Sequence, residues 1–261
     1  MHDQSCFVTL TYDDDHIPYG DTLHKPDFQN FKKRLNKKFI PKNPNEKGSP
    51  AYSDYRLRNA IPYFYCGEYG ETTARPHYHA LLFNWRPDDP ELFATNEDAN
   101  LYTSKTLTEL WGMGHCTFGD ITFESAAYTA RYTTKKITGP AAAEHYTSID
   151  QDTGEVFERL PEYADMSRNP GIGKRWLQKY GHDTYEKDEV IMRGFPMKPP
   201  RAYDKDWEIK DPQTWHSVSL KRRSDAVKRL EKVPDFLKSD RRLYSAQIIA
   251  EKRLNKRENF K

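Results

Sequence analysis

Residues 67–83 read Gly-Glu-Tyr-Gly-Glu-Thr-Thr-Ala-Arg-Pro-His-Tyr-His-Ala-Leu-Leu-Phe, and this stretch constrains the fold more than any other. The aromatic run at 63–68 and the apolar run at 77–84 are joined by a short, glycine-containing connection, which predicts a β-hairpin. Side chains alternate between the two faces of a strand, so His77 and His79 are expected to point to the same side, with Tyr78 between them on the other.

A carboxylate accompanies the two histidines, because Glu68 lies within the otherwise aromatic first strand of the hairpin. A charged group is costly there unless it is paired or coordinated. Two imidazole nitrogens and one carboxylate, with positions left open for a phosphate, suit a divalent ion such as Mg or Mn. A His-x-His pair alone is a weak signal, but in this context the sequence predicts a metal site made of Glu68, His77 and His79.

The flanking segments predict an α+β domain with helices packed on a central antiparallel sheet. A strand at 6–12 is expected to be central, because it is apolar on both faces. We expect further helices at 28–39, 101–111 and 124–137, a strand at 114–121, loops at 41–54 and 140–165, a short helix at 174–181 and an extended segment at 189–203. The order strand, helix, two strands, helix, strand, helix is typical of this class.

The carboxyl-terminal part differs in charge and pattern from the rest of the chain. Residues 201–261 hold 17 basic and 10 acidic residues, whereas residues 1–200 hold 24 basic and 29 acidic ones. From Trp215 onward the pattern is mostly helical, with a break at Pro234. We expect a core domain at 1–140, an insertion or extension packed on it at 141–203, and a basic helical region at 204–261. The basic excess indicates nucleic-acid binding only weakly, since a solvated amphipathic helix explains it as well.

The composition argues against a membrane protein. Mean hydropathy is −0.97, 31% of the residues are charged, and no apolar run approaches the roughly 18 residues that a spanning helix needs. The first residues lack the pattern of a signal peptide. Three cysteines, Cys6, Cys66 and Cys116, are far apart and odd in number, as expected of reduced thiols. These features predict a cytoplasmic protein with no membrane partner.

A second group of reactive residues follows at Tyr128, Tyr132 and Lys135, whose spacing places them on one face of a helix. Aromatic residues four apart usually pack into a core, but here alanines and basic residues surround them. A phenol with its usual pKa near ~10 is a poor nucleophile. A lysine favours the phenolate or stabilises the transition state, and a metal polarises the phosphate. Together the two motifs predict a protein that cuts a DNA strand and keeps hold of the cut end.

Two other stretches carry weaker signals. The run Asp13-Asp14-Asp15 is explained most simply as the solvated end of a strand, rather than as a cation site. The stretch 171–174 (Gly-Ile-Gly-Lys) lacks the spacing of a phosphate-binding loop. Together with Arg168 it is nevertheless suited to touch a DNA backbone through N–H groups and charge.

The motifs, in this order, resemble the HUH endonuclease superfamily of rolling-circle replication initiators, and more closely the initiators of the Microviridae in their gokushovirus branch. The resemblance is carried by the stretches 7–12, 67–79, 128–135, 167–173 and 198–203. It implies a ferredoxin- or RRM-like HUH endonuclease fold with a helical carboxyl-terminal extension.

The resemblance also implies a function, which is site-specific nicking and rejoining of single-stranded DNA at a replication origin. One tyrosine would form a 5′-phosphotyrosyl link and free a 3′-OH that primes synthesis, and the second would act in the next round. It assigns catalysis to Tyr128, Tyr132 and Lys135, and the binding of Mg or Mn to Glu68, His77 and His79. The residues expected to contact DNA are Thr9, Thr11, Arg75, Arg131, Lys136, Arg168 and Lys174. A host helicase and polymerase in the bacterial cytoplasm would be partners.

Three other interpretations stay open. The chain could be a plasmid initiator or transposase of the same superfamily, a non-catalytic single-stranded DNA-binding module, or a metalloenzyme that uses water. Members of the gokushovirus branch also carry an upstream basic, cysteine-containing segment, whereas this chain opens just before the first motif. That departure is consistent with a truncated or internally started form whose origin recognition or folding is impaired.

Overall fold

The computed structural model describes residues 2, 4–70, 72–95, 100–131, 137, 139–149, 153–234 and 240–258. The chain forms two compact units, residues 1–176 and 177–261. The described part of the chain contains no helix with the length and apolar character needed to cross a membrane.

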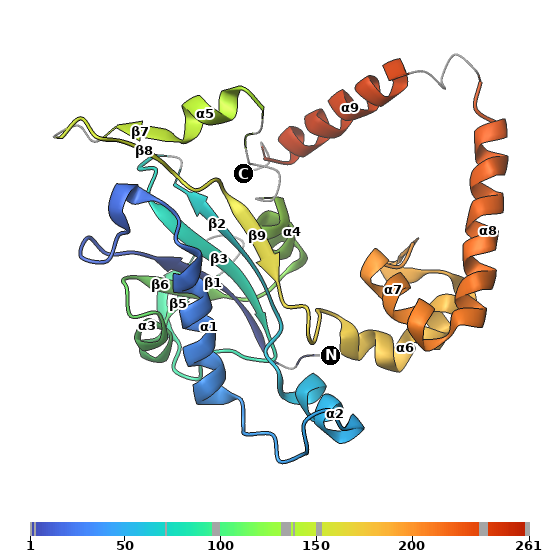
Figure 1. The fold of residues 1–261 in the computed structure, drawn as a ribbon, viewed down its shortest axis with the longest axis horizontal. Helices are drawn as coiled ribbons and strands as arrows, with labels where there is room; N and C mark the ends of the chain where they lie inside the picture. The colour runs from blue at the N-terminus through green and yellow to red at the C-terminus, as the bar shows by residue number, and fades with distance from the viewer. Residues whose placement is uncertain are drawn as a thin grey trace. The chain divides into compact units, whose positions relative to one another are not determined.

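A seven-stranded antiparallel sheet forms the centre of the first unit (Figure 1). Its strands are β1 (Ser5–Thr11), β2 (Tyr63–Tyr69), β3 (Pro76–Phe83), β4 (Glu91–Thr95), β5 (Asn100–Thr103), β6 (Cys116–Gly119) and β9 (Tyr163–Met166). They follow the order β4-β5-β6-β1-β3-β2-β9, so β1 is central and the β2–β3 hairpin lies directly beside it. A separate pair is formed by β7 (Thr147–Ile149) and β8 (Val156–Glu158).

Alternation along β1 and β3 divides the sheet into an apolar face and a polar face. Cys6, Val8 and Leu10 are fully buried on one side of β1, whereas the residues between them are only half-buried. The same alternation in β3 buries Tyr78 on the apolar face and turns His77 and His79 to the other.

Helices α1 and α3 pack on the apolar face, and α1 crosses the front of the sheet in Figure 1. The helices and the 3₁₀ turn of this unit are η1 (Tyr19–Asp21), α1 (Lys25–Phe39), α2 (Pro50–Asn59), α3 (Lys105–Trp111), α4 (Phe123–Arg131) and α5 (Ala141–Tyr146). Phe28, Phe31 and Leu35 recur at helical spacing on α1 and are buried. Phe28 stacks on Tyr65 of the sheet with a ring separation of 3.7 Å. This packing leaves the polar face available to α4.

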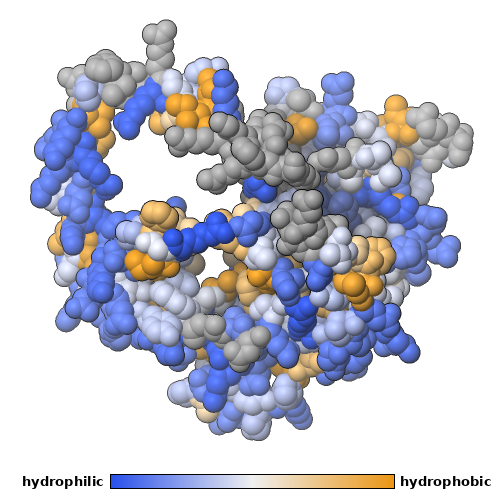
Figure 2. Space-filling view, turned by 180° about the vertical axis from the view of Figure 1, so that it is seen from behind, coloured by the Kyte–Doolittle hydropathy of each residue, from blue (hydrophilic) through white to orange (hydrophobic). Residues whose placement is uncertain are grey.

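The second unit is mainly helical and has its own small core. It holds most of α6 (Lys174–Lys187), then β10 (Val190–Met192), β11 (Phe195–Met197), α7 (Arg201–Lys210), α8 (Pro212–Glu231) and α9 (Asp240–Glu258). Trp207 stacks on Tyr185 at 4.9 Å in the core, and a Cβ at Gly181 would lie only 2.2 Å from the Trp207 ring. Arg222 of α8 pairs with Asp188 and Asp204 beside this core. The outer surface of α8, at the left of Figure 2, is mostly hydrophilic.

The predicted fold class is confirmed, with its antiparallel sheet, packed helices and helical carboxyl-terminal extension. Four local expectations were wrong. The helix expected from residue 101 begins at Lys105, after β5; the loop expected at 41–54 contains the start of α2; the loop expected at 140–165 contains α5, β7, β8 and part of β9; and the segment expected to be extended at 189–203 forms the β10–β11 hairpin and the start of α7. The domain boundaries expected at 140 and 203 stay a prediction.

Candidate active site

The register of three adjacent strands brings the metal-site residues together on the polar face of the sheet. In the antiparallel pairs, Glu68 of β2 lies opposite His77 of β3, and Thr9 of β1 lies opposite His79. Directly opposed residues have Cβ atoms about 5 Å apart. Side chains from β1, β2 and β3 therefore converge on one point.

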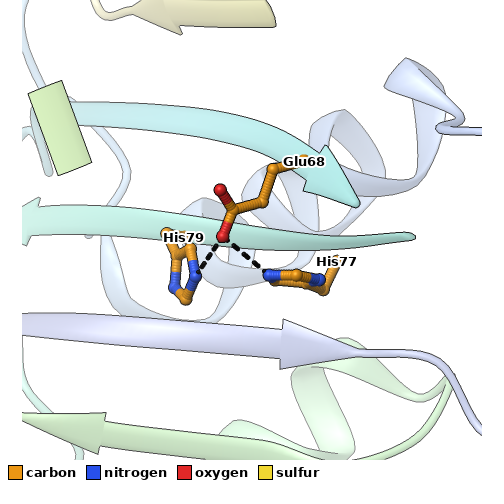
Figure 3. Close-up of side chains that lie close together, drawn as sticks. All are labelled: Glu68, His77 and His79. Atoms are coloured by element: carbon orange, nitrogen blue, oxygen red, sulfur yellow. Dashed lines mark hydrogen bonds and ion pairs between the residues drawn. The ribbon is translucent and has the colours of Figure 1, made fainter. Parts of the chain in front are cut away.

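Both imidazole rings point at the same carboxylate oxygen, as Figure 3 shows. Nε2 of His77 and Nε2 of His79 each lie 2.8 Å from Oε1 of Glu68. One ligand atom from each residue falls within 4.8 Å of the other two. Within the described ranges this is the only group of three or more such side chains close enough to hold a metal ion. The predicted convergence of Glu68, His77 and His79 is confirmed, while metal binding itself stays a prediction.

The hydrogen bond on the far side of His77 indicates why this cluster suits a cation. Nδ1 of His77 lies 3.1 Å from the backbone oxygen of Arg75, which can only accept, so Nδ1 carries the hydrogen. The neutral ring then has a lone pair on Nε2, and that lone pair faces Oε1 of Glu68. Two acceptors stay this close only when a proton or a cation links them.

Glu68 is buried, with 4% of its surface exposed, and its second oxygen, Oε2, has no hydrogen-bond partner among the described residues. Burial opposes the ionisation of Glu68, but hydrogen bonds with His77 and His79 outweigh it and lower the pKa of this carboxyl group. A buried carboxylate with one unused oxygen is costly unless a further ligand satisfies it. The donor set and this orphaned oxygen therefore fit a hard divalent cation.

Thr9 supports His79 from the neighbouring strand. Its hydroxyl Oγ1 lies 3.0 Å from Nδ1 of His79, on the side of the ring that faces away from Glu68. A partner on this nitrogen fixes the orientation of the imidazole, as is usual for histidines that ligate metals. Thr9, expected at first to contact DNA, is placed to position a candidate ligand.

Tyr78 anchors β3 from the opposite face of the sheet. Its hydroxyl bonds to the hydroxyl of Tyr12 at 2.9 Å and to the backbone of His24 at the start of α1. Tyr12 in turn donates to Asp27 at 2.6 Å. Sequence reasoning placed Tyr78 on this face but assigned it no role, and it holds the strand that carries both histidines.

Tyr128 brings a phenol to the cluster from α4. Its ring centre lies 5.7 Å from that of His79, with the two planes at 75°, and 39% of the residue is exposed. Thr122 and Ser125 exchange hydrogen bonds between side chain and backbone at the start of α4, which fixes where the helix begins. The expected proximity of a tyrosine helix to the histidines is present for Tyr128.

The other predicted residues have varied positions. Tyr132, Lys135 and Lys136 lie outside the described residues. Thr11 lies opposite His77 in the sheet, Arg131 ends α4, and Lys174 begins α6. Arg75 donates to the backbone oxygen of Tyr12 at 3.1 Å and pairs with Asp14 at 2.7 Å. Arg168 pairs with Asp165 at 3.5 Å, beside the start of β2, whereas Glu68 lies near the end of that strand. The structure thus gathers Thr9, Thr11, Glu68, the two histidines and Tyr128, but not Arg168.

Comparison with known proteins places this site in a protein family. Residues 5–137 match the family model for replication-associated proteins of the ORF2 type. The chain is 35% identical over 85% of its length to replication-associated protein VP4 of Bdellovibrio phage phiMH2K. It is 30% identical over 94% to replication-associated protein ORF2 of Spiroplasma virus 4, and 26% identical over 77% to replication-associated protein ORF4 of Chlamydia phage 1.

These matches confirm the resemblance to phage replication proteins of the Microviridae type. They span 63%, 67% and 45% of the lengths of the three relatives. No solved structure matches the chain.

Proposed function

The chain belongs to the ORF2-type family of replication-associated proteins, and from this premise we propose that it nicks and rejoins single-stranded DNA to initiate rolling-circle replication. In this proposal the chain is an HUH-type endonuclease. Glu68, His77 and His79 bind the scissile phosphate together with Mg or Mn, and Tyr128 is the nucleophile. The single observation that carries the proposal is the phenol of Tyr128 beside His79, above a cluster of two imidazoles and a carboxylate.

The chemical step requires a nucleophile held against a phosphate whose charge is neutralised. The hydroxyl oxygen of Tyr128 attacks phosphorus, the bond from phosphorus to the 3′ oxygen breaks, and the leaving oxygen takes up a proton to become a free 3′-OH. The proton of the tyrosine is lost to solvent or to a nearby base, and the 5′ end stays linked to the tyrosine. The energy of the broken ester is kept in the new one, so a later attack by a 3′-OH rejoins the strand without ATP.

Glu68, His77 and His79 fit a divalent ion, which would polarise the phosphate and stabilise the charge that develops in the transition state. Thr9 and the backbone oxygen of Arg75 hold the two imidazoles in the orientation that directs both Nε2 atoms inward. The exposure of Tyr128 allows a strand to reach its hydroxyl.

A second tyrosine would let the enzyme act in successive rounds. Tyr132 follows Tyr128 by four residues. We propose that it cuts the regenerated origin while Tyr128 still carries the displaced strand, with Lys135 stabilising the phenolate or the transition state. Host helicase and polymerase in the bacterial cytoplasm would then extend the freed 3′-OH.

A covalent-adduct assay tests the proposal. Labelled single-stranded DNA is incubated with the protein and Mn, and adducts that survive denaturation are separated by electrophoresis. We expect a protein–DNA adduct that Tyr128→Phe weakens and the double variant Tyr128→Phe, Tyr132→Phe abolishes. Tyr19→Phe is the matched control, because Tyr19 is an exposed phenol, with 70% of its surface accessible, on the η1 turn.

The outcomes separate the competing interpretations. Cleavage that persists in the double variant would refute the tyrosine mechanism in favour of a hydrolytic metalloenzyme. Binding of the strand by the wild-type protein without any cleavage in Mn would instead indicate a non-catalytic DNA-binding module.

A further inference from the structure

A cavity of about 320 Å³ lies between α1, α2 and the segment that follows β9, all within the first unit. It is formed where the polar end of α1 meets one face of α2. Lys32 and Asn36 are four residues apart on α1, and Tyr52, Tyr55, Arg56 and Asn59 recur at helical spacing on α2. The segment 167–170 completes the wall.

Lys32 is the most unusual residue of this cavity, because it is a lysine with only 6% of its surface exposed. Its ammonium group donates to the backbone oxygen of Ile61 at 3.1 Å and lies 4.9 Å from the centre of the Tyr63 ring. No acidic side chain of the described residues pairs with it. Burial lowers the pKa of Lys32 to about 7. A buried cation without a carboxylate is stabilised by an anion that enters from outside.

The rest of the lining favours an anion that also carries an aromatic ring. Arg56 donates one hydrogen bond, to the backbone oxygen of Asn169 at 2.7 Å, and a guanidinium has further N–H groups to offer. Tyr52 and Tyr55 provide rings, on which bases stack, and the asparagine amides provide both donors and acceptors. In the described part of the chain, no aspartate or glutamate lines the cavity. Its volume lies within the roughly 300–1,000 Å³ of small-molecule sites.

We propose that this cavity binds one nucleoside phosphate, with Lys32 and Arg56 at the phosphate and Tyr52, Tyr55, Asn36 and Asn59 around the base. The ligand is either a free nucleotide or one nucleotide of a DNA strand. The second source rests on the proposed function. There the cavity becomes a specificity pocket that recognises a base outside the cut site.

The cavity and the cut site lie at opposite ends of β2. Tyr63 lines the cavity and Glu68 belongs to the metal cluster. At about 3.3 Å per residue, the five residues between them span about 16 Å. A nucleotide in the cavity is therefore not the one being cut, and the two sites can be tested separately.

Photo-cross-linking with 5-iododeoxyuridine locates the bound base. The full chain is irradiated with the free 5′-monophosphate of this nucleoside in one arm and with a single-stranded oligonucleotide containing it in the other. We expect a cross-link at Tyr52 or Tyr55, identified by mass spectrometry, in at least one arm. Lys32→Met, which keeps the volume of the side chain, should lower its yield at subsaturating ligand by about tenfold, as expected for the removal of one charge-assisted hydrogen bond.

The controls keep folding and nicking apart from binding in the cavity. Lys33→Met changes the neighbouring exposed lysine of α1 and should leave the cross-link unchanged, and Arg56→Gln should weaken it without altering the buried side of the cavity. The arm that cross-links identifies the source of the nucleotide. Absence of a cross-link at both tyrosines in both arms, or a yield that Lys32→Met leaves unchanged, overturns the proposal. Because the free-nucleotide arm needs no cleavage, the proposal can fail while nicking is intact, and the reverse.

Discussion

Thr9 shows how a single hydroxyl can control the candidate metal site. Its Oγ1 lies 3.0 Å from Nδ1 of His79, and valine has the same shape without the hydroxyl. Removal of such a supporting group typically weakens metal binding by about 10–100-fold. We expect Thr9→Val to weaken Mn binding by about tenfold and Glu68→Gln to weaken it further, both measured by titration with electron paramagnetic resonance of free Mn.

Two matched substitutions support this prediction. Thr9→Ser retains the hydroxyl and should bind Mn like the wild type. Thr117→Val removes a hydroxyl from the residue opposite Thr9 on β6, away from the histidines, and should also have little effect. Wild-type affinity in Thr9→Val would show that the hydroxyl does not orient His79.

Lys32 predicts a pH dependence of stability. Burial lowers its pKa in the folded protein to about 7, from an ordinary value of 10.5. Below the lower value both states are charged and the folded state carries the full burial penalty. Between the two values the unfolded chain binds more protons than the folded one, so this contribution makes the folded protein more stable as pH rises. Lys32→Met should therefore stabilise the protein most below pH 7, by on the order of a few kcal/mol, and progressively less towards pH 9.

Urea unfolding of both proteins from pH 6 to pH 9 measures this difference, and taking the difference cancels the titration of groups common to both. Lys33→Met, at an exposed position, should give a difference that does not vary with pH. A gain in stability from Lys32→Met that is the same at pH 6 and pH 9 would mean that Lys32 keeps an ordinary pKa in the folded state.

At the scale of helices and strands, the elements predicted best are those whose own residues determine them. The strand β1 and the β2–β3 hairpin carry dense apolar and aromatic alternation, and their pairing follows from it. The convergence of Glu68, His77 and His79 was predictable for the same reason, because it needs only the alternation of a strand and the register of a hairpin.

The elements that sequence reasoning missed depend on signals with two meanings. Ser49 and Pro50 favour a loop, but here Ser49 caps α2 by accepting from the backbone N–H of Tyr52, and Pro50 occupies its first turn. Ser104 likewise caps α3, so the residues just before it were free to pair as β5. Whether such a residue ends a loop or starts a helix is decided by packing.

The parts of the candidate sites that could not be predicted are contacts between distant segments. The hydrogen bond of Thr9 to His79 joins two strands separated by 70 residues, and the cavity around Lys32 requires α2, part of which was expected to be a loop. The proximity of Tyr128 to His79 was inferred from chemistry alone, since nothing in the spacing of the two motifs sets how α4 lies on the sheet.

For the whole molecule, the uneven distribution of charge matters more than the net charge of +2. The surplus of basic residues lies at 201–261, and not all of it is available to a partner. Arg222 is engaged by Asp188 and Asp204. Lys221, Arg223 and Lys228 are exposed on α8, and among the described residues none of them pairs with an acidic side chain. If the protein acts on DNA, these three cations are the ones that can contact phosphates.

Replacing Lys221, Arg223 and Lys228 together by glutamine should therefore weaken binding to single-stranded DNA of any sequence. For each phosphate that the variant no longer binds, the slope of log affinity against log salt concentration should fall by about 0.7, because fewer counterions are released. Fluorescence anisotropy over a range of salt concentrations measures the slope. The charge-preserving set Lys221→Arg, Arg223→Lys and Lys228→Arg should keep the wild-type slope. An unchanged slope in the glutamine variant would mean that α8 is a solvated helix with no part in DNA binding, and that the strand is held by the first unit alone.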